Sequence, residues 1–526
     1  MGQGRRRGEV RAARPNRQTR QRLSRRQLSD SLQERFPAPE FDSPTGSVFP
    51  PPAGRRVYCN RNLRLDQVKA VGFDMDYTLA IYRQAEMDRL SIEATVRKLV
   101  DRGYPEELLS MKYRTDFPIR GLLIDRKLGN VLKMDRYRYV KTAYHGFRRL
   151  SREERRGAYH TRRLRPGTGR YHWVDTLYSL SEVAVYAAVI EHLEGRGGTL
   201  DYGRLFSDIR QCADLSHQDG SILDVVLGDL PRYVDRDSDL GALFHKLRSA
   251  GKRLFLLTNS GPQYTDAMMS YLLNDALDEY PSWKNYLDYI CTASKKPGFF
   301  TDRAPFVDVE TQETSREPVR GRMYTGGNMT DLQRALGFAS DEVLYVGDHI
   351  YGDVLRATKE SAWRAVMIIQ EMDDELRVLR EHASSFERAD SLQQMRDVVQ
   401  DELREHQARL KRIERTLQGQ ETAPDRAVWD AKRVRHRRSI DRLRAQIKEL
   451  DAERAALDEV LDDAFHPFWG SFFKAGNEVS NFGNQVEQYA ALYTSRATNL
   501  LQYSPMHYFQ SPRHRMPHET GNSPGT

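Results

Sequence analysis

The sequence predicts an α/β protein: a doubly wound parallel sheet, a large cap inserted after the first strand and a helical hairpin towards the C-terminus. Short apolar runs bounded by polar residues or glycine are typical of buried strands, and here they alternate with segments of helical periodicity. Such alternation favours a parallel sheet. Roughly 180 residues separate the first strand from the next clear one. Because a βα connection needs far fewer, the insertion is expected to form a second layer.

Composition excludes several classes of protein. The chain has 526 residues, of which 39% are hydrophobic and 30% charged, and no apolar run approaches the ~20 residues of a membrane helix. Cys59, Cys212 and Cys291 lie too far apart for a disulfide framework or a zinc pattern. We therefore expect a cytoplasmic protein of a reducing compartment, with no membrane partner.

Residues 1–56 are predicted to form an Arg- and Pro-rich disordered arm outside the core. Arginine crowds the stretch from Arg5 to Arg26 against a single Glu9 and contributes to a net charge of +8. The main interpretation is a solvated tail. Contact with a nucleic acid (RNA) or a membrane surface is an alternative, and so is an organelle-targeting peptide, since such peptides are rich in arginine and poor in acids.

The first strand, Val68 to Phe73, leads directly into Asp74 and Asp76. Side chains alternate along an extended strand, so the two carboxylates face one small volume if the strand continues through the motif. Ligands bind at this carboxyl end of the strands in open α/β sheets. Two close carboxylates repel each other, and either a Mg²⁺ ion or a shared proton would compensate.

The catalytic core is expected to be discontinuous, made of residues 57–80 and 236–400, with the cap at 81–235 between them. Later strands are expected at Arg253–Ser260, at Tyr286–Thr292, at Val343 with its loop to Asp353, and at Trp363–Ile369. Polar residues close or follow the first three of these strands: Thr258, Asn259, Ser260, Lys296, Asp348 and Asp353.

Residues 401–463 are predicted to form an antiparallel helical hairpin. Apolar residues recur there at spacings of three and four, which is typical of a coiled-coil seam. A basic run, Arg433 to Arg438, is interpreted as a solvated face, with nucleotide or acidic-partner binding as the alternative. Residues 464–526 are dense in aromatic side chains and end in a loose polar tail. We expect the aromatic residues to be buried in the core or at a subunit interface.

The polar residues at the strand ends suit phosphoryl transfer. Asp74 can act as a nucleophile, and Asp76 can protonate the leaving alkoxide and then activate water. Lys296 can screen the nucleophile against a dianionic phosphate. Thr258, Asn259 and Ser260 offer donors to phosphate oxygens, Asp348 adds a metal-ligand carboxylate, and Asp353 can anchor the metal's waters or the lysine.

These motifs resemble those of a known family. The order D-x-D-x-T, a strand ending in Thr or Ser, Lys, then G-D-x4-D resembles the haloacid dehalogenase superfamily. The stretches Gly72 to Ala80, Leu257 to Ser260, Lys296 to Phe300 and Gly347 to Asp353 are similar to the cytosolic purine 5′-nucleotidase (IMP/GMP-specific) family. Arg120 to Lys133, the hairpin and the tail at Met516–Glu519 fit as well. The likeness covers roughly residues 57–520.

The resemblance implies a Mg²⁺-dependent phosphatase whose cap binds a purine. It assigns Asp74 as nucleophile and metal ligand, Asp76 as acid/base and ligand through its carbonyl, and Asp348 as metal ligand. Thr258, Asn259, Ser260 and Lys296 would hold the phosphate. Arg120, Asp125 and Lys133 would lie on the base side, where a 6-oxopurine presents acceptors to Arg or Lys. It also implies phosphate transfer to nucleosides and a homo-oligomer.

Two other functions stay open at this point. The chain could be a phosphatase for another phosphometabolite, in which Arg120, Asp125 and Lys133 have only structural roles. It could also be an interaction protein that retains the fold and binds through the arm, the hairpin and the aromatic segment. The complete set of carboxylates and phosphate donors favours an enzyme, since a scaffold needs none of them.

Overall fold

The computed structural model describes residues 50–159, 164, 167–197, 200–418 and 426–512. Residues 1–49 of the predicted arm, residues 419–425 and the stretch Met516–Glu519 lie outside these residues. The end of the predicted arm is described and includes the short 3₁₀ helix η1 (Ala53–Arg55), so the core begins before residue 57. The chain separates into two units, residues 1–50 and 51–526, and the second contains all elements below. Within the described residues, every helix is either too short or too polar to cross a membrane.

A ten-stranded sheet forms the core, in the order β1-β20-β17-β16-β3-β11-β12-β15-β13-β14. The strands from β20 to β15 are parallel to one another. The outer pairings, β1 with β20, β13 with β15 and β14 with β13, are antiparallel. Their bounds are β1 Tyr58–Cys59, β3 Ala70–Phe73, β11 Arg253–Leu257, β12 Tyr289–Thr292, β13 Phe306–Asp308, β14 Thr314–Ser315, β15 Met323–Gly326, β16 Val343–Gly347, β17 Arg364–Ile368 and β20 Leu492–Thr494.

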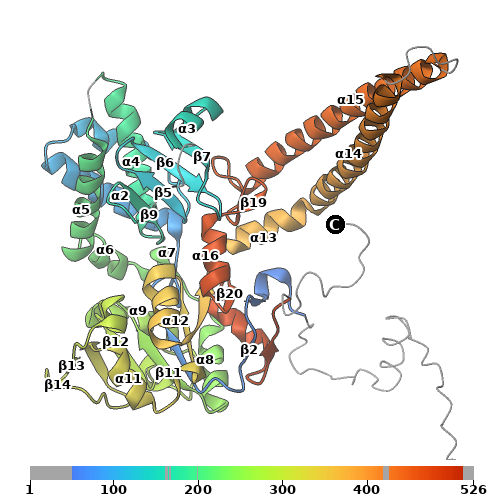
Figure 1. Cartoon of the computed structure of the whole chain (residues 1–526). Helices are drawn as coiled ribbons and strands as arrows, with labels where there is room; N and C mark the ends of the chain where they lie inside the picture. The colour runs from blue at the N-terminus through green and yellow to red at the C-terminus, as the bar shows by residue number, and fades with distance from the viewer. Residues whose placement is uncertain (1–49, 160–163, 165–166, 198–199, 419–425, 513–526) are drawn as a thin grey trace, which may run out of the picture. The chain divides into compact units, whose positions relative to one another are not determined.

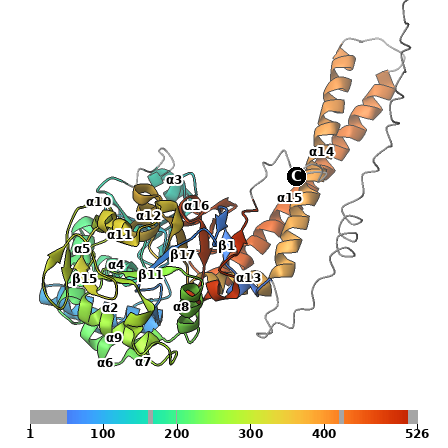
Figure 2. The same ribbon diagram turned by 90° about the horizontal axis from the view of Figure 1, so that it is seen from below.

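The sheet is apolar on both faces, as a doubly wound fold requires. Along β11, Leu254 and Leu256 join one hydrophobic cluster, and Phe255 and Leu257 join another. Helices α8 (Leu240–Ser249) and α9 (Pro262–Leu273) contribute to the first cluster; α10 (Gly298–Thr301), α11 (Met329–Leu336) and α12 (Arg356–Ser361) contribute to the second (Figures 1 and 2). The predicted fold class is confirmed.

Glycine at the middle of β3 allows tight packing against the neighbouring strand. A Cβ atom on Gly72 would lie 2.2 Å from the ring of Phe255. The central strand β3 pairs with β11 on one side and with β16 on the other, so Val71 lies opposite both Leu254 and Leu344. This register brings the carboxyl ends of the three strands, and the polar residues that follow them, to one edge.

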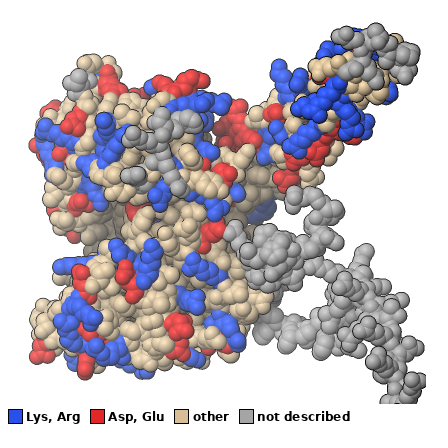
Figure 3. Space-filling model, in the orientation of Figure 1, with Lys and Arg blue, Asp and Glu red and all other residues tan. Residues whose placement is uncertain are grey.

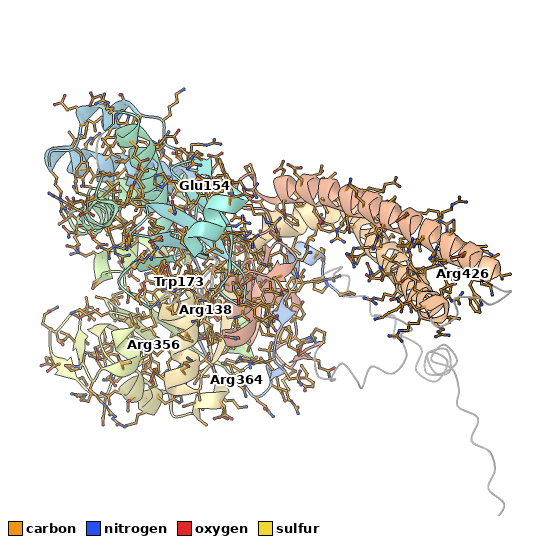
Figure 4. The ribbon with its side chains drawn as sticks, turned by 45° about the horizontal axis from the view of Figure 1, so that its top comes forward. Arg138, Glu154, Trp173, Arg356, Arg364 and Arg426 are labelled. Atoms are coloured by element: carbon orange, nitrogen blue, oxygen red, sulfur yellow. The ribbon has the colours of Figure 1, made fainter. Side chains whose placement is uncertain are left out.

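The insertion after β3 forms the predicted second layer. Its five-stranded antiparallel sheet has the order β8-β7-β6-β5-β9, and Trp173 in Figure 4 marks β9. The strands are β5 Leu122–Asp125, β6 Asn130–Met134, β7 Val140–His145, β8 Arg148–Arg149 and β9 Tyr171–Val174. The helices are α2 Gln84–Asp101, α3 Arg152–Tyr159, α4 Ser179–Glu194, α5 Tyr202–Gln218, α6 Leu223–Gly228 and α7 Leu230–Tyr233. A short ribbon, β4 (Ile81–Tyr82) with β10 (Val234–Asp235), closes the insertion where it leaves and rejoins the core.

The hairpin consists of α14 (Ala383–Gln418) and α15 (Arg426–Phe465), which follow α13 (Met372–Glu381). Its seam buries Val399 and Leu403 against Ile440 and Leu443. The first helix begins at Ala383, earlier than the predicted residue 401. Sequence periodicity missed this part because Ala389 and Leu392 are its only buried apolar residues before Val399.

The aromatic C-terminal segment is buried in part, as predicted. It contains β18 (Lys474–Ala475), β19 (Glu478–Val479), α16 (Asn481–Tyr489), β20 and β21 (Tyr508–Phe509), the last paired with β2 (Leu63–Arg64). Trp469 is buried, and its indole Nε1–H donates to the carbonyl of Phe117 at 2.6 Å. The segment therefore completes the core sheet through β20 and also packs against the cap.

Candidate active site

Four strand ends bring the predicted polar residues together. Asp74 follows β3, Thr258 follows β11, Lys296 follows β12 and Asp348 follows β16. The backbone N–H of Asp74 donates to the carbonyl of Val346 on β16 at 2.9 Å, and that of Thr258 donates to Cys291 on β12 at 2.9 Å. These cross-strand bonds fix the loops at the edge of the sheet, where their side chains meet.

Lys296 is the centre of the cluster. Its Nζ lies 2.8 Å from Asp74 Oδ1, 2.7 Å from Asp353 Oδ1 and 3.0 Å from the hydroxyl of Tyr345. Gly347 makes this arrangement possible, because a Cβ atom there would lie 2.7 Å from the Cβ of Asp353. Asp353 can then fold back from the π-helical turn Ile350–Leu355 towards the lysine. The predicted contact between Asp353 and the lysine is present.

The cluster is dense in buried charge. Burial raises the pKa of Asp74 well above its usual value, with further contributions from Asp353, Asp348 and Asp76, although Lys296 opposes the rise. Burial also raises the pKa of Asp348 to about 7. For Lys296, burial disfavours the charged form, but Asp353 and Asp74 outweigh it and raise the pKa well above the usual value. The lysine therefore stays cationic.

Asp76 points to a different set of partners from Asp74. Its Oδ1 accepts a hydrogen bond from the hydroxyl of Tyr82 at 2.6 Å, and its Oδ2 accepts one from Ser260 Oγ at 2.6 Å. Thr258 Oγ1 lies 3.5 Å from the same oxygen. The chain turns sharply after Asp76, where Tyr77 has a left-handed φ of 56°. The motif therefore does not stay extended, and its two carboxylates contact different partners.

Asn259 holds the lysine loop in place. Its Oδ1 accepts the backbone N–H of Lys296 at 2.6 Å, and its Nδ2 donates to the Lys296 carbonyl at 3.1 Å. This pair of bonds orients the loop so that the lysine side chain reaches Asp74. In the structure Asn259 is a positioning residue; its predicted contact with phosphate stays a prediction.

The carboxylates fit a divalent cation. Oxygen atoms of Asp74, Asp348 and Asp353, all buried, lie within 4.8 Å of one another. Carboxylates outnumber the cations Lys296 and Arg120 beside them. A bound cation would favour the charged forms of these carboxylates, and the all-oxygen donor set suits a hard divalent ion.

Arg120 is a buried residue that holds the backbone of Asp348 in place. Its side chain is fully buried and forms a bidentate pair with Glu371, with Nε–Oε1 and Nη2–Oε2 both 2.7 Å. Its Nη1 donates to the carbonyl of Asp348 at 2.8 Å. The guanidinium thus orients a candidate metal ligand. All of these donors have protein partners, so the structure gives Arg120 a different role from the predicted contact with a base.

Asp125 and Lys133 also differ from their predicted base contacts. Asp125 is fully buried and accepts two hydrogen bonds from Arg170 and one from Tyr159. Lys133 is buried, and its Nζ donates to the carbonyls of Trp469 at 2.5 Å and Ser471 at 2.6 Å. These bonds join the cap sheet to the C-terminal segment. A sequence motif can mark such residues as characteristic of a family, but it does not show whether they contact a ligand or form a buried structural pair.

Lys133 makes stability depend on pH. Burial lowers its pKa to about 8, whereas an unfolded lysine titrates near 10.4. Between these values the unfolded chain binds a proton that the folded chain lacks, so stability rises with pH. We expect the free energy of unfolding of the native chain, minus that of Lys133→Met, to rise by up to about 3 kcal/mol from pH 8 to 10.5. Denaturant titrations measure it.

The exposed Lys127 provides the matched control. Lys127→Met should leave the difference from the native chain independent of pH over the same range, because its side chain is solvated in both states. A pH-independent difference for Lys133→Met as well would contradict the account of a desolvated amine.

Two cap residues that the sequence analysis did not single out, Asp175 and Tyr178, lie next to the site. Asp175, just after β9, lies 3.3 Å from His349 next to Asp348. Tyr178 packs edge-on against Tyr77, with ring centroids 4.8 Å apart. Two residues close to the sequence motifs also contribute: His349 lies inside the motif after β16, and Tyr82 comes three residues after Leu79. Their spacing in the sequence did not indicate that Tyr82 would bond to Asp76 or that His349 would pair with Asp175 of the cap.

Comparisons with known proteins agree with the geometry. The profile of the 5′ nucleotidase family matches residues 57–521. The chain is 27% identical over 481 residues to the 5′-nucleotidase domain-containing protein 2 of both Homo sapiens and Rattus norvegicus; the matches cover 88% of this chain, and 85% and 80% of those proteins. Among solved structures, CbbY from Rhodobacter sphaeroides in complex with phosphate gives a TM-score of 0.23 at 14% identity, covering 57% of this chain and 86% of that one.

Proposed function

The chain belongs to the 5′ nucleotidase family, and from this premise we propose that it is a phosphoric monoester hydrolase of the haloacid dehalogenase type that acts on purine nucleoside 5′-monophosphates of the IMP or GMP type. The observation that carries the proposal is the position of Lys296, bonded to both Asp74 and Asp353 while Asp76 is held apart by Ser260 and Tyr82. The proposed nucleophile Asp74, the cation Lys296 and the acid Asp76 are thus separate groups at the carboxyl ends of neighbouring strands.

In the first proposed step, Asp74 attacks the phosphorus atom. Its Oδ1 bonds to Lys296 and to the backbone N–H of Met75, while Oδ2 has no hydrogen-bond partner among the described residues. Oδ2 forms the new P–O bond as the bond to the nucleoside 5′ oxygen breaks. Asp76 gives its proton to the departing alkoxide, and Asp74 is left as an acyl phosphate.

In the second step, water attacks the acyl phosphate. Asp76, now a carboxylate, removes a proton from the water, the bond between phosphorus and Asp74 Oδ2 breaks, and phosphate leaves. Thr258 and Ser260 then provide donors near the phosphate oxygens, and Lys296 balances their charge. When a nucleoside hydroxyl replaces the water, the same step transfers the phosphate.

Mg²⁺ is the proposed cofactor. Asp74 and Asp348 would bind it with their carboxylates, and Asp76 would bind it through its backbone carbonyl. Asp353 would hold the metal's water ligands or Lys296. Bound there, the ion supplies positive charge that stabilises the phosphate oxygens.

The proposed purine specificity and the proposed homo-oligomer are both based on family resemblance. Since Arg120, Asp125 and Lys133 are engaged within the protein, the base must be read by other groups. Asp175 and His349 are partly exposed, with side-chain exposures of 26% and 30%, and lie beside Asp348 at the contact between cap and core. They are the proposed polar contacts of the nucleoside, and a homo-oligomer is the proposed assembly.

A panel of nucleotides tests this function. We expect Mg²⁺-dependent phosphate release from IMP and GMP to exceed that from AMP and CMP, and chelation with EDTA to stop it. Release that is equal for all four would contradict purine specificity. Release from none of them, by protein with intact circular dichroism, would contradict the nucleotidase function.

Tyr82 offers a test of the role of Asp76. In Tyr82→Phe, Asp76 loses a 2.6 Å hydrogen bond and its orientation towards the leaving oxygen. We expect kcat to fall by about tenfold for a nucleoside monophosphate, the equivalent of about 1.4 kcal/mol. With p-nitrophenyl phosphate, whose leaving group needs no general acid, the decrease should be much smaller.

Tyr264→Phe is the matched control, because the Tyr264 hydroxyl bonds to Tyr82 at 2.9 Å and reaches Asp76 only through it. It should have the smaller effect. An equal loss for alkyl and aryl substrates in Tyr82→Phe would show that the tyrosine does not position the acid.

A further inference from the structure

Helix α15 of the hairpin is basic in its first half and acidic in its second. Residues 426–448 contain nine Lys or Arg and two Asp, and residues 449–465 contain seven Asp or Glu and one Arg. Figure 4 marks Arg426 at the start of this helix, and Figure 3 shows Lys and Arg gathered over the outer part of the hairpin. The two halves therefore carry opposite and nearly equal charge.

An exposed stripe runs along α15 beside its seam with α14. The stripe is defined by eight exposed residues at helical spacing: Val428, Arg435, Arg438, Arg442, Gln446, Glu449, Glu453 and Val460. The seam occupies another side of the helix, where Ile440, Leu443 and Leu461 are buried. Two of the stripe's members are large apolar residues in water, with Val428 52% and Val460 57% exposed.

The stripe is basic on one side of residue 444 and acidic on the other, and most of its charges are inverted about this centre; Arg442 lies opposite the neutral Gln446. Val428 and Val460 lie at equal distances from this centre, and so do Arg435 and Glu453. Arg438 and Glu449 match to within one residue. In an antiparallel pair of helices, residues at equal distances from the centre face each other. Arg435 and Arg438 of one copy would therefore meet glutamates of the other, Arg442 would meet Gln446, and valine would meet valine at both ends.

Most of these charges are unused within the chain. Among the described residues, Arg435, Arg438 and Glu449 form no ion pair. Glu453 pairs with Arg388, but both side chains are half exposed, at 50% and 51%, so this pair contributes little. Like charges three residues apart repel on one helical face, so Arg435 and Arg438 gain from an acidic partner.

We propose that this stripe binds a second copy of the chain in an antiparallel, two-fold symmetric pair. A two-fold contact requires a surface complementary to itself, which the inverted charges supply. From 428 to 460 the helix is about 48 Å long and about 10 Å wide, giving a contact near 1,000 Å² for both copies, at the lower end of specific interfaces. A nucleic acid would match only the basic half and would repel Glu449 and Glu453. The inference assigns a surface to the homo-oligomer proposed above and does not depend on the nucleotidase activity.

Sedimentation velocity of the full chain tests the pair. In 0.1 M salt we expect a pair that weakens in 1 M salt, where the Debye length falls from about 10 Å to about 3 Å. The double change Arg435→Glu with Arg438→Glu should weaken association at least about 100-fold, and so should Glu449→Arg with Glu453→Arg. An equimolar mixture of the two variants should restore a pair, because each then presents the charge that the other needs.

Two controls keep the result clear. Circular dichroism should show unchanged helix content in both variants, and Arg444→Glu, a reversal on another side of the same helix, should leave association unchanged. A chain whose association is unaffected by either double change would overturn the proposal. So would two variants that both dissociate but do not associate when mixed. Nucleic acid copurifying only with chains that keep Arg435 and Arg438 would instead assign the basic half to a polyanion.

Discussion

Replacing Asp74 by asparagine is expected to lower phosphate release by about 10⁴-fold or more, the order seen when a catalytic nucleophile is removed. The amide cannot form the acyl phosphate, while the side chain keeps its size and the hydrogen bond that its Oδ1 accepts from Met75. Because Asp74 lies among other carboxylates, losing its charge also relieves repulsion. We therefore expect a folded, nearly inactive protein. Steady-state assays together with thermal unfolding measure both properties.

Asp341→Asn provides the control. Asp341 is exposed and precedes β16, whereas Asp348 follows the opposite end of that strand, so the same chemical change should leave kcat unaltered. If Asp74→Asn kept more than a few per cent of native turnover, the nucleophile would have to be sought elsewhere in the cluster.

Replacing Lys296 by methionine is expected to reduce stability and activity together. Its side chain is 4% exposed, and its removal leaves Asp74 and Asp353 facing each other without a cation. Breaking a buried ion pair costs about 3–5 kcal/mol. Loss of the charge that opposes the phosphate should lower kcat by about 10²–10³-fold. Denaturant unfolding and single-turnover assays report the two effects separately.

The neighbouring Lys295 is exposed and has a left-handed φ of 55°. Lys295→Asn removes the same charge one residue away, with a residue that tolerates this conformation, and should preserve both stability and turnover. Equal effects of the two substitutions would mean that net charge near the loop matters, and not the bonds of Lys296.

Sequence alone predicted the strand ends and the residues that follow them. Buried strands are short and apolar, and the carboxyl ends of parallel strands must meet, so Asp74, Thr258, Lys296 and Asp348 could be grouped before their distances were known. Asp353 followed from the same motif. Family resemblance then supplied the roles that are proposed for them.

What sequence could not predict depends on contacts between distant segments. Arg120 is bound by Glu371, 251 residues away in the chain, and Lys133 is bound by carbonyls of a segment more than 300 residues later. No local pattern records such pairs, so both residues were assigned to a ligand. The hydrogen bond from Tyr82 to Asp76 was missed because it depends on the sharp turn at Tyr77.

The most direct measurement of the central claim is to trap the phosphorylated enzyme. The protein is mixed with Mg²⁺ and IMP labelled in its phosphate, quenched in acid within milliseconds and digested, and the peptides are examined by mass spectrometry. The account predicts that the label is found on the peptide containing Asp74 and that it is absent from Asp74→Asn. Rapid phosphate release by native protein with no label on Asp74, or with label on another residue, would contradict it.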